Sequence, residues 1–293
     1  MLDLPSPLAV VCHDTGAANI IIAWLRASPG IECRAVMQGP AATLWRRSFG
    51  DAPLETDLDT AVSGAAVVLT GTGWGSDLEH RARLRAAQWG IRSIAVLDHW
   101  VNYPERFTRE GATQLPDEVW VTDVYAKERA EQCFPLRPVI VCENLYLQGE
   151  LAKIAPLPVA APAANDVLYA LEPVRNDWGK GTPGEFQALD YFADRLQRLG
   201  LPADSLIRLR PHPSDPPGKY TEWMQRHSEL RTVLDQSADI AEALGRVRWV
   251  AGCESFALVI ALNAGRNVIC TLPPWAPPCR LPHRGLIHLK DVA

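Results

Sequence analysis

Residues 208 to 215 read Arg-Leu-Arg-Pro-His-Pro-Ser-Asp and combine two cations, an imidazole and a hydroxyl in one short stretch. Arg208 and Arg210 lie on the same side of an extended strand, so two guanidinium groups and an imidazole are expected to converge at its carboxyl end. The strand must end at Pro211, because proline has no N–H to donate and fixes φ. Cations, imidazole and hydroxyl suit a phosphate-bearing ligand. The stretch predicts a phosphate site containing Arg210 and His212; the alternative is a structural turn with a hydrogen-bonded histidine.

A second candidate is Gly252-Cys-Glu-Ser255, which precedes an almost entirely apolar helix predicted over residues 256–264. The amides at a buried helix N-terminus need partners. Ser255 can cap this helix, or a ligand phosphate can occupy the position, because the helix dipole favours anions there. Glu254 is placed to bind ribose hydroxyls, or else it is an early acidic residue that complements the dipole.

Near the N-terminus, the apolar run 8–12 predicts a buried parallel strand, and a loop of small residues follows it. The loop lacks the full G-x-G-x-x-G pattern, so a dinucleotide fingerprint is not supported. Either the loop is a tight turn with Asp14 or Thr15 as N-cap, or His13 and Asp14 face a ligand.

The strand predicted over residues 92–97 ends in Asp98-His99-Trp100, with Tyr103 close behind. Loops at the carboxyl ends of strands carry function in α/β sheets. Asp98 or His99 is therefore a candidate general base, and Trp100 or Tyr103 is expected to stack on a sugar ring. The alternative is an Asx-type turn with an aromatic plug.

Between these two loops, Thr70-Gly-Thr-Gly-Trp-Gly75 has three glycines at alternate positions. Its backbone amides could cradle an anion or allow a substrate to approach closely. The alternative is that the glycines only permit a turn.

The composition is that of a globular protein, with 293 residues, 47% hydrophobic and 22% charged. A net charge of −5 argues against nucleic-acid binding through a broad basic face. The first residues have no basic n-region of a signal peptide, and no stretch approaches the roughly 18 apolar residues of a membrane helix. The seven cysteines form no Cys-x-x-Cys pair, which favours free thiols over a disulfide framework or a zinc site. We expect a cytoplasmic protein.

Alternating strand and helix patterns predict an α/β fold with two Rossmann-like domains facing across a cleft. Residues 1–150 are predicted to form the first domain. Residues 151–165, rich in proline and alanine, are predicted to be a linker, and residues 166–293 the second domain.

Arg210-Pro-His-Pro213, together with Gly252-Cys-Glu-Ser255 and the run to Gly265, resembles the HP-motif glycosyltransferases of GT-B-type fold. That group includes bacterial sialyl- and polysialyltransferases, capsule Kdo transferases and CDP-glycerol glycerophosphotransferases. The resemblance covers roughly residues 166–290. It implies that His212 and Ser255 contact the donor phosphate and that Glu254 contacts the nucleotide. By analogy, it implies that residues 166–293 form the nucleotide-sugar-binding domain and that residues 1–150 form the acceptor and catalytic domain.

The predicted function is sugar transfer from a CMP- or UDP-linked donor to a glycan or other hydroxyl acceptor, in surface-polysaccharide or glycoconjugate synthesis. Asp98 or Asp14 is expected to take the acceptor proton. Donor-phosphate binding is also assigned to Arg175, in the loop that leaves the strand predicted over residues 166–171, and acceptor binding to His13.

No cofactor and no metal are expected, because no compact carboxylate cluster demands a metal and the phosphate cluster can stabilise the leaving group. The expected partners are therefore the donor and a glycan or small-molecule acceptor, with no nucleic acid. One alternative is a nucleotide-sugar 2-epimerase; another is a non-catalytic protein that binds a nucleotide or a sugar. Peripheral membrane association and the oligomeric state stay open.

Overall fold

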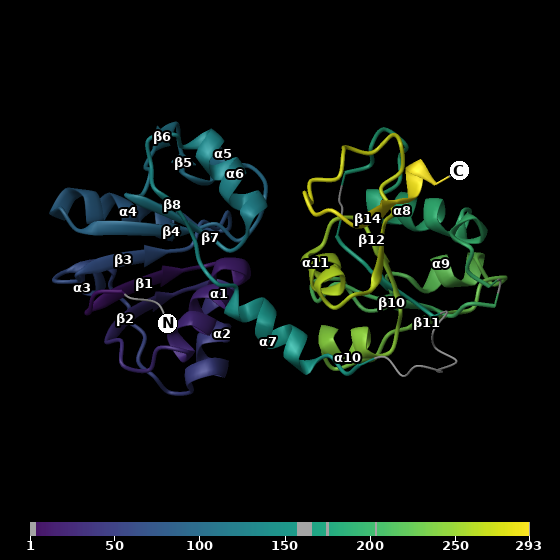
Figure 1. Ribbon diagram of the computed structural model, residues 1–293, viewed down its shortest axis with the longest axis horizontal. Helices are drawn as coiled ribbons and strands as arrows, with labels where there is room; N and C mark the ends of the chain where they lie inside the picture. The colour runs from purple at the N-terminus through teal and green to yellow at the C-terminus, as the bar shows by residue number, and fades with distance from the viewer. Residues whose placement is uncertain (1–3, 157–165, 174–175, 203, 293) are drawn as a thin grey trace. The chain divides into compact units, whose positions relative to one another are not determined.

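The computed structural model describes residues 4–156, 166–173, 176–202 and 204–292. The chain divides into two units, Met1–Tyr146 and Leu147–Ala293 (Figure 1). The division falls inside helix α7 (Leu145–Lys153), so the first residues of the predicted linker are helical. Residues 157–165 of that linker lie outside the described residues. The roles assigned to the two domains stay predictions.

Unit 1 is built on a six-stranded sheet in the order β2-β1-β3-β4-β7-β8. Every neighbouring pair in it is parallel. The strands are β1 (Leu8–Cys12), β2 (Cys33–Met37), β3 (Val67–Thr70), β4 (Arg92–Val96), β7 (Glu118–Val121) and β8 (Val139–Val141). A short antiparallel hairpin is separate, made of β5 (Thr108–Arg109) and β6 (Ala112–Thr113).

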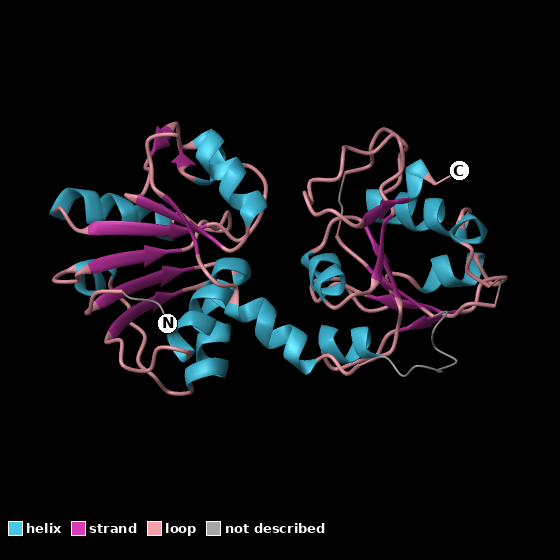
Figure 2. Ribbon diagram, viewed as in Figure 1, coloured by secondary structure: helices cyan, strands magenta, loops and turns pink. Residues whose placement is uncertain are grey.

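Helices cover both faces of this sheet (Figure 2). Along β1, Leu8 and Val10 pack in one core cluster with α1 (Thr15–Arg26) and α2 (Gly39–Phe49). Ala9 and Val11 pack in another with α3 (Leu58–Val62) and α4 (Leu78–Trp89). The alternation of side chains along a strand therefore feeds two cores, which is why β1 is apolar throughout. The remaining helices are α5 (Tyr103–Arg106) and α6 (Val124–Cys133).

Unit 2 has a six-stranded sheet in the order β11-β10-β9-β12-β13-β14, again parallel throughout. Its strands are β9 (Val167–Ala170), β10 (Ile207–Arg210), β11 (Thr232–Leu234), β12 (Trp249–Gly252), β13 (Asn267–Cys270) and β14 (Leu286–His288). Its helices are α8 (Gly184–Ala193), α9 (Thr221–Arg226), α10 (Ile240–Gly245) and α11 (Phe256–Asn263), with 3₁₀ turns at Leu196–Leu199 and Leu289–Asp291.

Strand β10 ends directly before Pro211, as predicted. Ile207 and Leu209 are buried, whereas Arg208 and Arg210 alternate with them and are partly exposed. The prediction of an α/β fold with two Rossmann-like units is confirmed.

Each sheet has a topological switch point, where the strand order reverses. In unit 1 it lies between β1 and β3, because β2 adds on the other side of β1. In unit 2 it lies between β9 and β12, because β10 and β11 extend the opposite edge. Ligands of open parallel sheets bind outside the carboxyl ends of the strands at such points. The residues that follow β1, β3, β9 and β12 therefore define where to look for a site.

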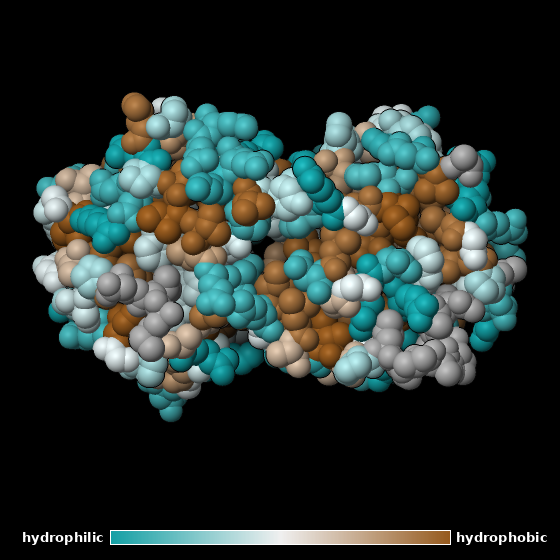
Figure 3. All heavy atoms as spheres, in the orientation of Figure 1, coloured by the Kyte–Doolittle hydropathy of each residue, from teal (hydrophilic) through white to brown (hydrophobic). Residues whose placement is uncertain are grey.

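On the visible surface of each unit, hydrophilic and hydrophobic residues are interspersed (Figure 3). Large exposed apolar side chains include Leu136, Val124 and Trp74, the last being 50% exposed. Within the described ranges, none of the helices combines the length and the apolar character needed to cross a bilayer.

Candidate functional site

His13 and Asp14 form a hydrogen-bonded pair at the switch point of unit 1. The Asp14 carboxylate lies 2.6 Å from His13 Nδ1, and its other oxygen accepts a 2.7 Å hydrogen bond from the amide of Trp74. Burial acts to raise the pKa of Asp14, but hydrogen bonds from His13, Trp74 and Gly75 outweigh it and lower that pKa. When His13 Nδ1–H donates its hydrogen bond to the Asp14 carboxylate, the lone pair of the imidazole lies on Nε2. The pair therefore has the arrangement of a general base with its orienting carboxylate.

Glycines enclose this pair closely. A Cβ added at Gly73 would lie 2.4 Å from an Asp14 oxygen, and one at Gly75 would lie 2.8 Å from His13 Cε1. A Cβ at Gly39, whose φ is +50°, would lie 2.6 Å from His13 Nε2. These positions need glycine for close approach, so the alternating glycines after β3 do more than permit a turn.

A buried carboxylate from α4 supports the same loop. Glu79 is 2% exposed, and its Oε1 accepts a 2.8 Å hydrogen bond from the amide of His13. Burial raises the pKa of Glu79. Arg83, one turn further along α4, is 1% exposed and donates to Thr70 Oγ1 and to the carbonyl of Gly71. Burial lowers the pKa of Arg83 to about 10. Sequence reasoning missed both residues.

Asp98 follows β4, and its carboxylate is held by Arg106. Asp98 Oδ1 lies 3.0 Å from Arg106 Nη1, and Arg106 also donates to Val101 and Thr72. The other carboxylate oxygen lies against Gly16 in the first turn of α1, where an added Cβ would be only 1.7 Å away. A catalytic role for Asp98 stays a prediction. In that role, the carboxylate would act while it is paired with Arg106.

The structure corrects the sequence prediction for the aromatic residues that follow Asp98. Trp100 is 4% exposed and donates from Nε1 to Asp123 at 2.8 Å; Tyr103 is fully buried and stacks on Phe134. Burial also raises the pKa of Tyr103. Their rings are part of the core, so neither offers a face for a sugar. The backbone amide of Trp100 donates to His99 Nδ1, which leaves the proton of a neutral His99 on Nε2.

The exposed aromatic at this switch point is Trp74, which lies in the glycine-rich loop after β3. Two guanidinium groups lie over its ring, with Arg106 Cζ 5.8 Å and Arg109 Cζ 5.9 Å from the centroid. Its backbone amide holds Asp14. Trp74 was part of the glycine-rich motif in the sequence, but its exposure is visible only in the structure.

In unit 2, His212 lies in a tightly bonded turn after β10. His212 Nδ1 accepts from the amide of Ser214 at 3.2 Å, and its own amide donates to Asp215 Oδ2 at 3.0 Å. Asp215 in turn binds Lys219 at 2.7 Å and Tyr220 at 3.0 Å. Partial desolvation of the ring lowers the pKa of His212. A neutral His212 therefore carries its proton on Nε2 and is a hydrogen-bond donor on an exposed turn.

The convergence of Arg208 and Arg210 with His212 stays a prediction, and the structure shows both guanidinium groups in ion pairs with other segments. Arg208 binds Asp166, which precedes β9, at 3.0 Å. Arg210 binds Asp235, which follows β11, at 2.5 Å, and the carbonyl of Ser237 at 3.1 Å. Carboxylates of neighbouring segments neutralise both guanidinium groups. Their role here is to tie β9, β10 and β11 together.

At the start of α11, protein groups occupy the positions that the sequence left open. Ser255 Oγ accepts a 3.0 Å hydrogen bond from the amide of Ala257, so Ser255 caps the helix. Glu172 Oε1 accepts from the amide of Glu254 at 2.6 Å. Burial raises the pKa of Glu172 to about 7. The side chain of Glu254 binds the amide of Arg280 at 2.9 Å and its guanidinium at 2.8 Å.

Arg175, the remaining predicted donor residue, lies outside the described residues. Glu172 is recognisable in the sequence as part of the exit loop of β9. Its contact with Glu254, 82 positions away, is visible only in the structure. Sequence reasoning also missed Arg280, which lies in the proline-rich segment after β13.

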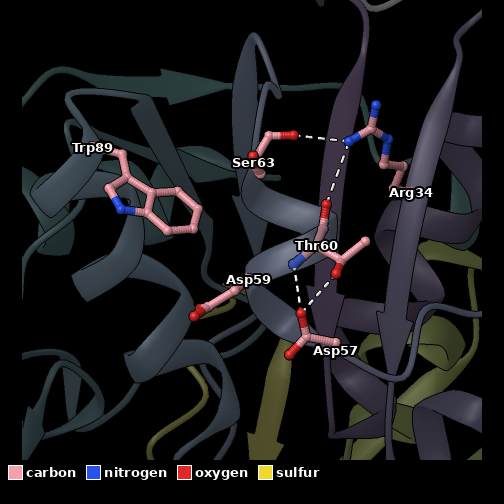
Figure 4. A pocket seen from close by; sticks show the side chains of 6 residues that line it. All are labelled: Arg34, Asp57, Asp59, Thr60, Ser63 and Trp89. Atoms are coloured by element: carbon pink, nitrogen blue, oxygen red, sulfur yellow. Dashed lines mark hydrogen bonds between the residues drawn. The ribbon is translucent and has the colours of Figure 1, made fainter.

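A pocket of about 450 Å³ lies elsewhere on unit 1 (Figure 4). It is lined by Arg34, Asp57, Asp59, Thr60, Ser63 and Trp89. Arg34 Nη1 donates to the carbonyl of Ser63 at 2.8 Å, and the side chain of Asp57 accepts from Thr60. These residues lie near the amino end of β2 and the end of α4, away from the carboxyl ends of the strands, so the pocket is not part of the candidate site.

Comparison with known proteins places the fold. No protein-family model matches the chain, and no curated protein matches its sequence. Among solved structures, the UDP-GlcNAc 2-epimerase from Methanocaldococcus jannaschii matches with a TM-score of 0.59 at 9% identity, over 90% of this chain and 83% of that one. The Neisseria meningitidis UDP-GlcNAc 2-epimerase bound to UDP-GlcNAc matches with a TM-score of 0.54 at 12% identity, over 90% and 82%.

A UDP-glucosyltransferase from Polygonum tinctorium matches with a TM-score of 0.47 at 12% identity, over 95% of this chain and 82% of that one. The two epimerase matches, with TM-scores above 0.5, show that the fold is of the GT-B type. The narrower resemblance to the HP-motif families stays a prediction.

Proposed function

We propose that this chain is a nucleotide-sugar enzyme that transfers the sugar to a hydroxyl acceptor. The observation that carries the proposal is the His13–Asp14 pair at the switch point of unit 1, with its 2.6 Å contact and its enclosing glycines. An acceptor hydroxyl must lose its proton as its oxygen bonds to the anomeric carbon. An imidazole oriented by a carboxylate is suited to take that proton.

In the proposed reaction, the acceptor proton goes to His13 Nε2, while the Asp14 carboxylate accepts the hydrogen bond from His13 Nδ1–H. The acceptor oxygen forms the new bond to the anomeric carbon, and the bond from that carbon to the donor phosphate oxygen breaks. The electron pair stays on the nucleotide phosphate. Within unit 2, Nε2–H of His212 is a proposed hydrogen-bond donor to a nucleotide phosphate, because Ser214 already occupies Nδ1. Trp74 is the proposed platform for a sugar ring, in place of Trp100 and Tyr103.

A UDP-linked donor is favoured because solved structures of the same fold are bound to UDP or UDP-GlcNAc. The same matches favour a second candidate, epimerisation at C2 of a UDP-sugar, since the matched proteins with TM-scores above 0.5 reported above are 2-epimerases. Metal independence stays a prediction.

The first test is a thermal-shift screen with CMP, CDP, UDP and GDP on the wild type, on His212→Ala and on His227→Ala as a control. A nucleotide at about 100 times its Kd should stabilise the wild type by about 2.7 kcal/mol. We expect one nucleotide to stabilise the wild type and the His227 variant, but not the His212 variant. Equal stabilisation of all three proteins would remove His212 from the site.

The second test separates transfer from epimerisation. The matching nucleotide-sugar is incubated in D₂O with and without a set of glycan acceptors. Transfer releases nucleotide only when an acceptor is present, and it leaves C2 unlabelled. An epimerase needs no acceptor and must break and remake the C2–H bond, so deuterium would enter at C2 and the transferase proposal would fail.

A further inference from the structure

Three side chains with metal-binding atoms lie together in unit 2, at the carboxyl ends of strands β13 and β14. The ligand atoms of Cys270, Cys279 and His288 all lie within 4.8 Å of one another. Cys270 is buried, and the other two are partly buried. None of these residues belongs to the proposed site around His212 and Glu254, so the cluster needs an explanation of its own.

The sheet itself brings two of the three ligands together. Strands β13 and β14 are parallel neighbours, and Cys270 and His288 are register partners at their last paired position. Side chains of directly paired residues stand on the same face of a sheet. The thiol and the imidazole are therefore placed side by side by backbone pairing rather than by flexible side chains.

The third ligand comes from the connection between these strands. Residues 271–285 join β13 to β14 with no helix or strand of their own, and they include Pro273, Pro274, Pro277, Pro278 and Pro282. An irregular connection of this length has little secondary structure to hold it, so it is usually functional or needs an anchor. Cys279 lies in this connection and returns it to the sheet, packed with Cys253, Cys270 and Leu272.

Two thiolates and an imidazole are the ligand set of Zn²⁺. At Zn–S of about 2.3 Å and Zn–N of about 2.0 Å, tetrahedral ligand atoms lie about 3.5–3.8 Å apart. The observed limit of 4.8 Å allows that spacing with small side-chain rotations. Cysteine and histidine spread over two strands and a loop also explain why no Cys-x-x-Cys motif marks the site in the sequence.

We propose that Cys270, Cys279 and His288 bind one Zn²⁺ ion that anchors the β13–β14 connection. Water or a further protein group completes the coordination. We expect the ion also to restrain the neighbouring residue Arg280, whose amide and guanidinium donate hydrogen bonds to Glu254. The ion would thus fix the loop that supports the start of α11. This replaces the expectation that all the cysteines are independent thiols, and it does not depend on the proposed transferase activity.

The test uses the full-length protein, reduced and stripped of metal, titrated with Co²⁺. Thiolate ligands give cobalt an intense ligand-to-metal charge-transfer absorption, and tetrahedral geometry gives strong visible bands. We expect one equivalent to bind to the wild type and to Cys133→Ser, the matched control from α6. Cys279→Ser and His288→Gln should weaken binding by more than about 100-fold, because even supporting residues of metal sites cost 10–100-fold. Zn²⁺ should displace the cobalt.

A measurement without variants covers the case in which they fail to fold. In the wild type, Zn²⁺ should slow alkylation of Cys279 and leave that of Cys133 unchanged, with both sites read by peptide mass spectrometry. If the reduced wild type binds no cobalt, or if its thiolate band is unchanged in Cys279→Ser, the zinc proposal is wrong. Alkylation of Cys279 at the same rate with and without Zn²⁺ would also overturn it.

Discussion

Glu172→Gln should stabilise the protein at alkaline pH and remove a pH dependence of its stability. Glu172 accepts a 2.6 Å hydrogen bond from the amide of Glu254, and burial raises its pKa from 4.5 to about 7. The folded state therefore binds a proton between these values that the unfolded state has released. Stability falls with pH wherever the folded state binds more protons. The contribution of Glu172 is thus most favourable below about pH 4.5, is lost as pH rises to about 7, and stays lost above it.

The magnitude follows from the difference between the usual pKa of 4.5 and the pKa of about 7 in the folded protein. At about 1.4 kcal/mol per unit, ionising Glu172 in the folded protein costs about 3 kcal/mol. Glutamine has the same shape and cannot ionise, and its amide oxygen can still accept from Glu254. We therefore expect Glu172→Gln to raise the free energy of unfolding by about 3 kcal/mol at pH 8, and to change it by less than about 1 kcal/mol at pH 4.5.

The assay is urea denaturation between about pH 4.5 and 8.5, followed by hydrogen exchange at the β9 and β12 amides, which flank Glu172. Glu222→Gln is the matched control, because the Glu222 side chain is 86% exposed and makes only a 4.0 Å contact with Arg226. Stability curves of the wild type and Glu172→Gln that run parallel across this range would refute the reasoning. A gain at pH 8 in the control would show that the effect is general loss of negative charge.

Three further predictions concern unit 1. Gly16→Ala should lower the free energy of unfolding by about 1–3 kcal/mol, because the new Cβ would lie 1.7 Å from the Asp98 carboxylate. Urea denaturation measures this loss. The control Gly30→Ala, which has open space around the new Cβ, should show no such loss. Asp14→Asn should lower acceptor-dependent turnover by about 10²–10⁴-fold while leaving the nucleotide thermal shift intact, and an unchanged rate would contradict the base assignment. Trp74→Ala should raise the KM for a glycan acceptor more than it lowers kcat, and steady-state kinetics that show the reverse would exclude stacking.

The architecture was predictable because local patterns dictate it. The apolar run of β1 indicates a strand covered on both faces, and Pro211 fixes where β10 ends. The order of the strands, in contrast, is a property of the whole sheet. It decides that Asp166 and Asp235 flank β10 and neutralise Arg208 and Arg210, and no spacing along the chain reveals that.

The candidate site in unit 1 was predictable in its place but not in its roles. His13 and Asp14 follow the first strand, which marks them as ligand-facing in this class of sheet. The amide of Trp74, which orients Asp14, comes within reach only when β1 and β3 pair. The burial of Trp100 has a similar reason. The side chain of Trp100 donates to Asp123, which follows β7, the neighbour of β4 in the sheet. The two residues are 23 positions apart in the sequence.

A carboxylate already holds the start of α11, and this constrains the phosphate recognition that we propose for unit 2. The amide of Glu254, which the dipole of α11 makes attractive to an anion, donates to Glu172 instead. A phosphate can use this amide only after Glu172 turns away, since two anions cannot share one donor. The exposed turn at His212 has no such competitor on Nε2 among the contacts that the described residues show, and Asp215, Lys219 and Tyr220 fix its backbone. We therefore propose that His212 makes the first contact to a donor phosphate, and that the start of α11 is engaged only if Glu172 moves.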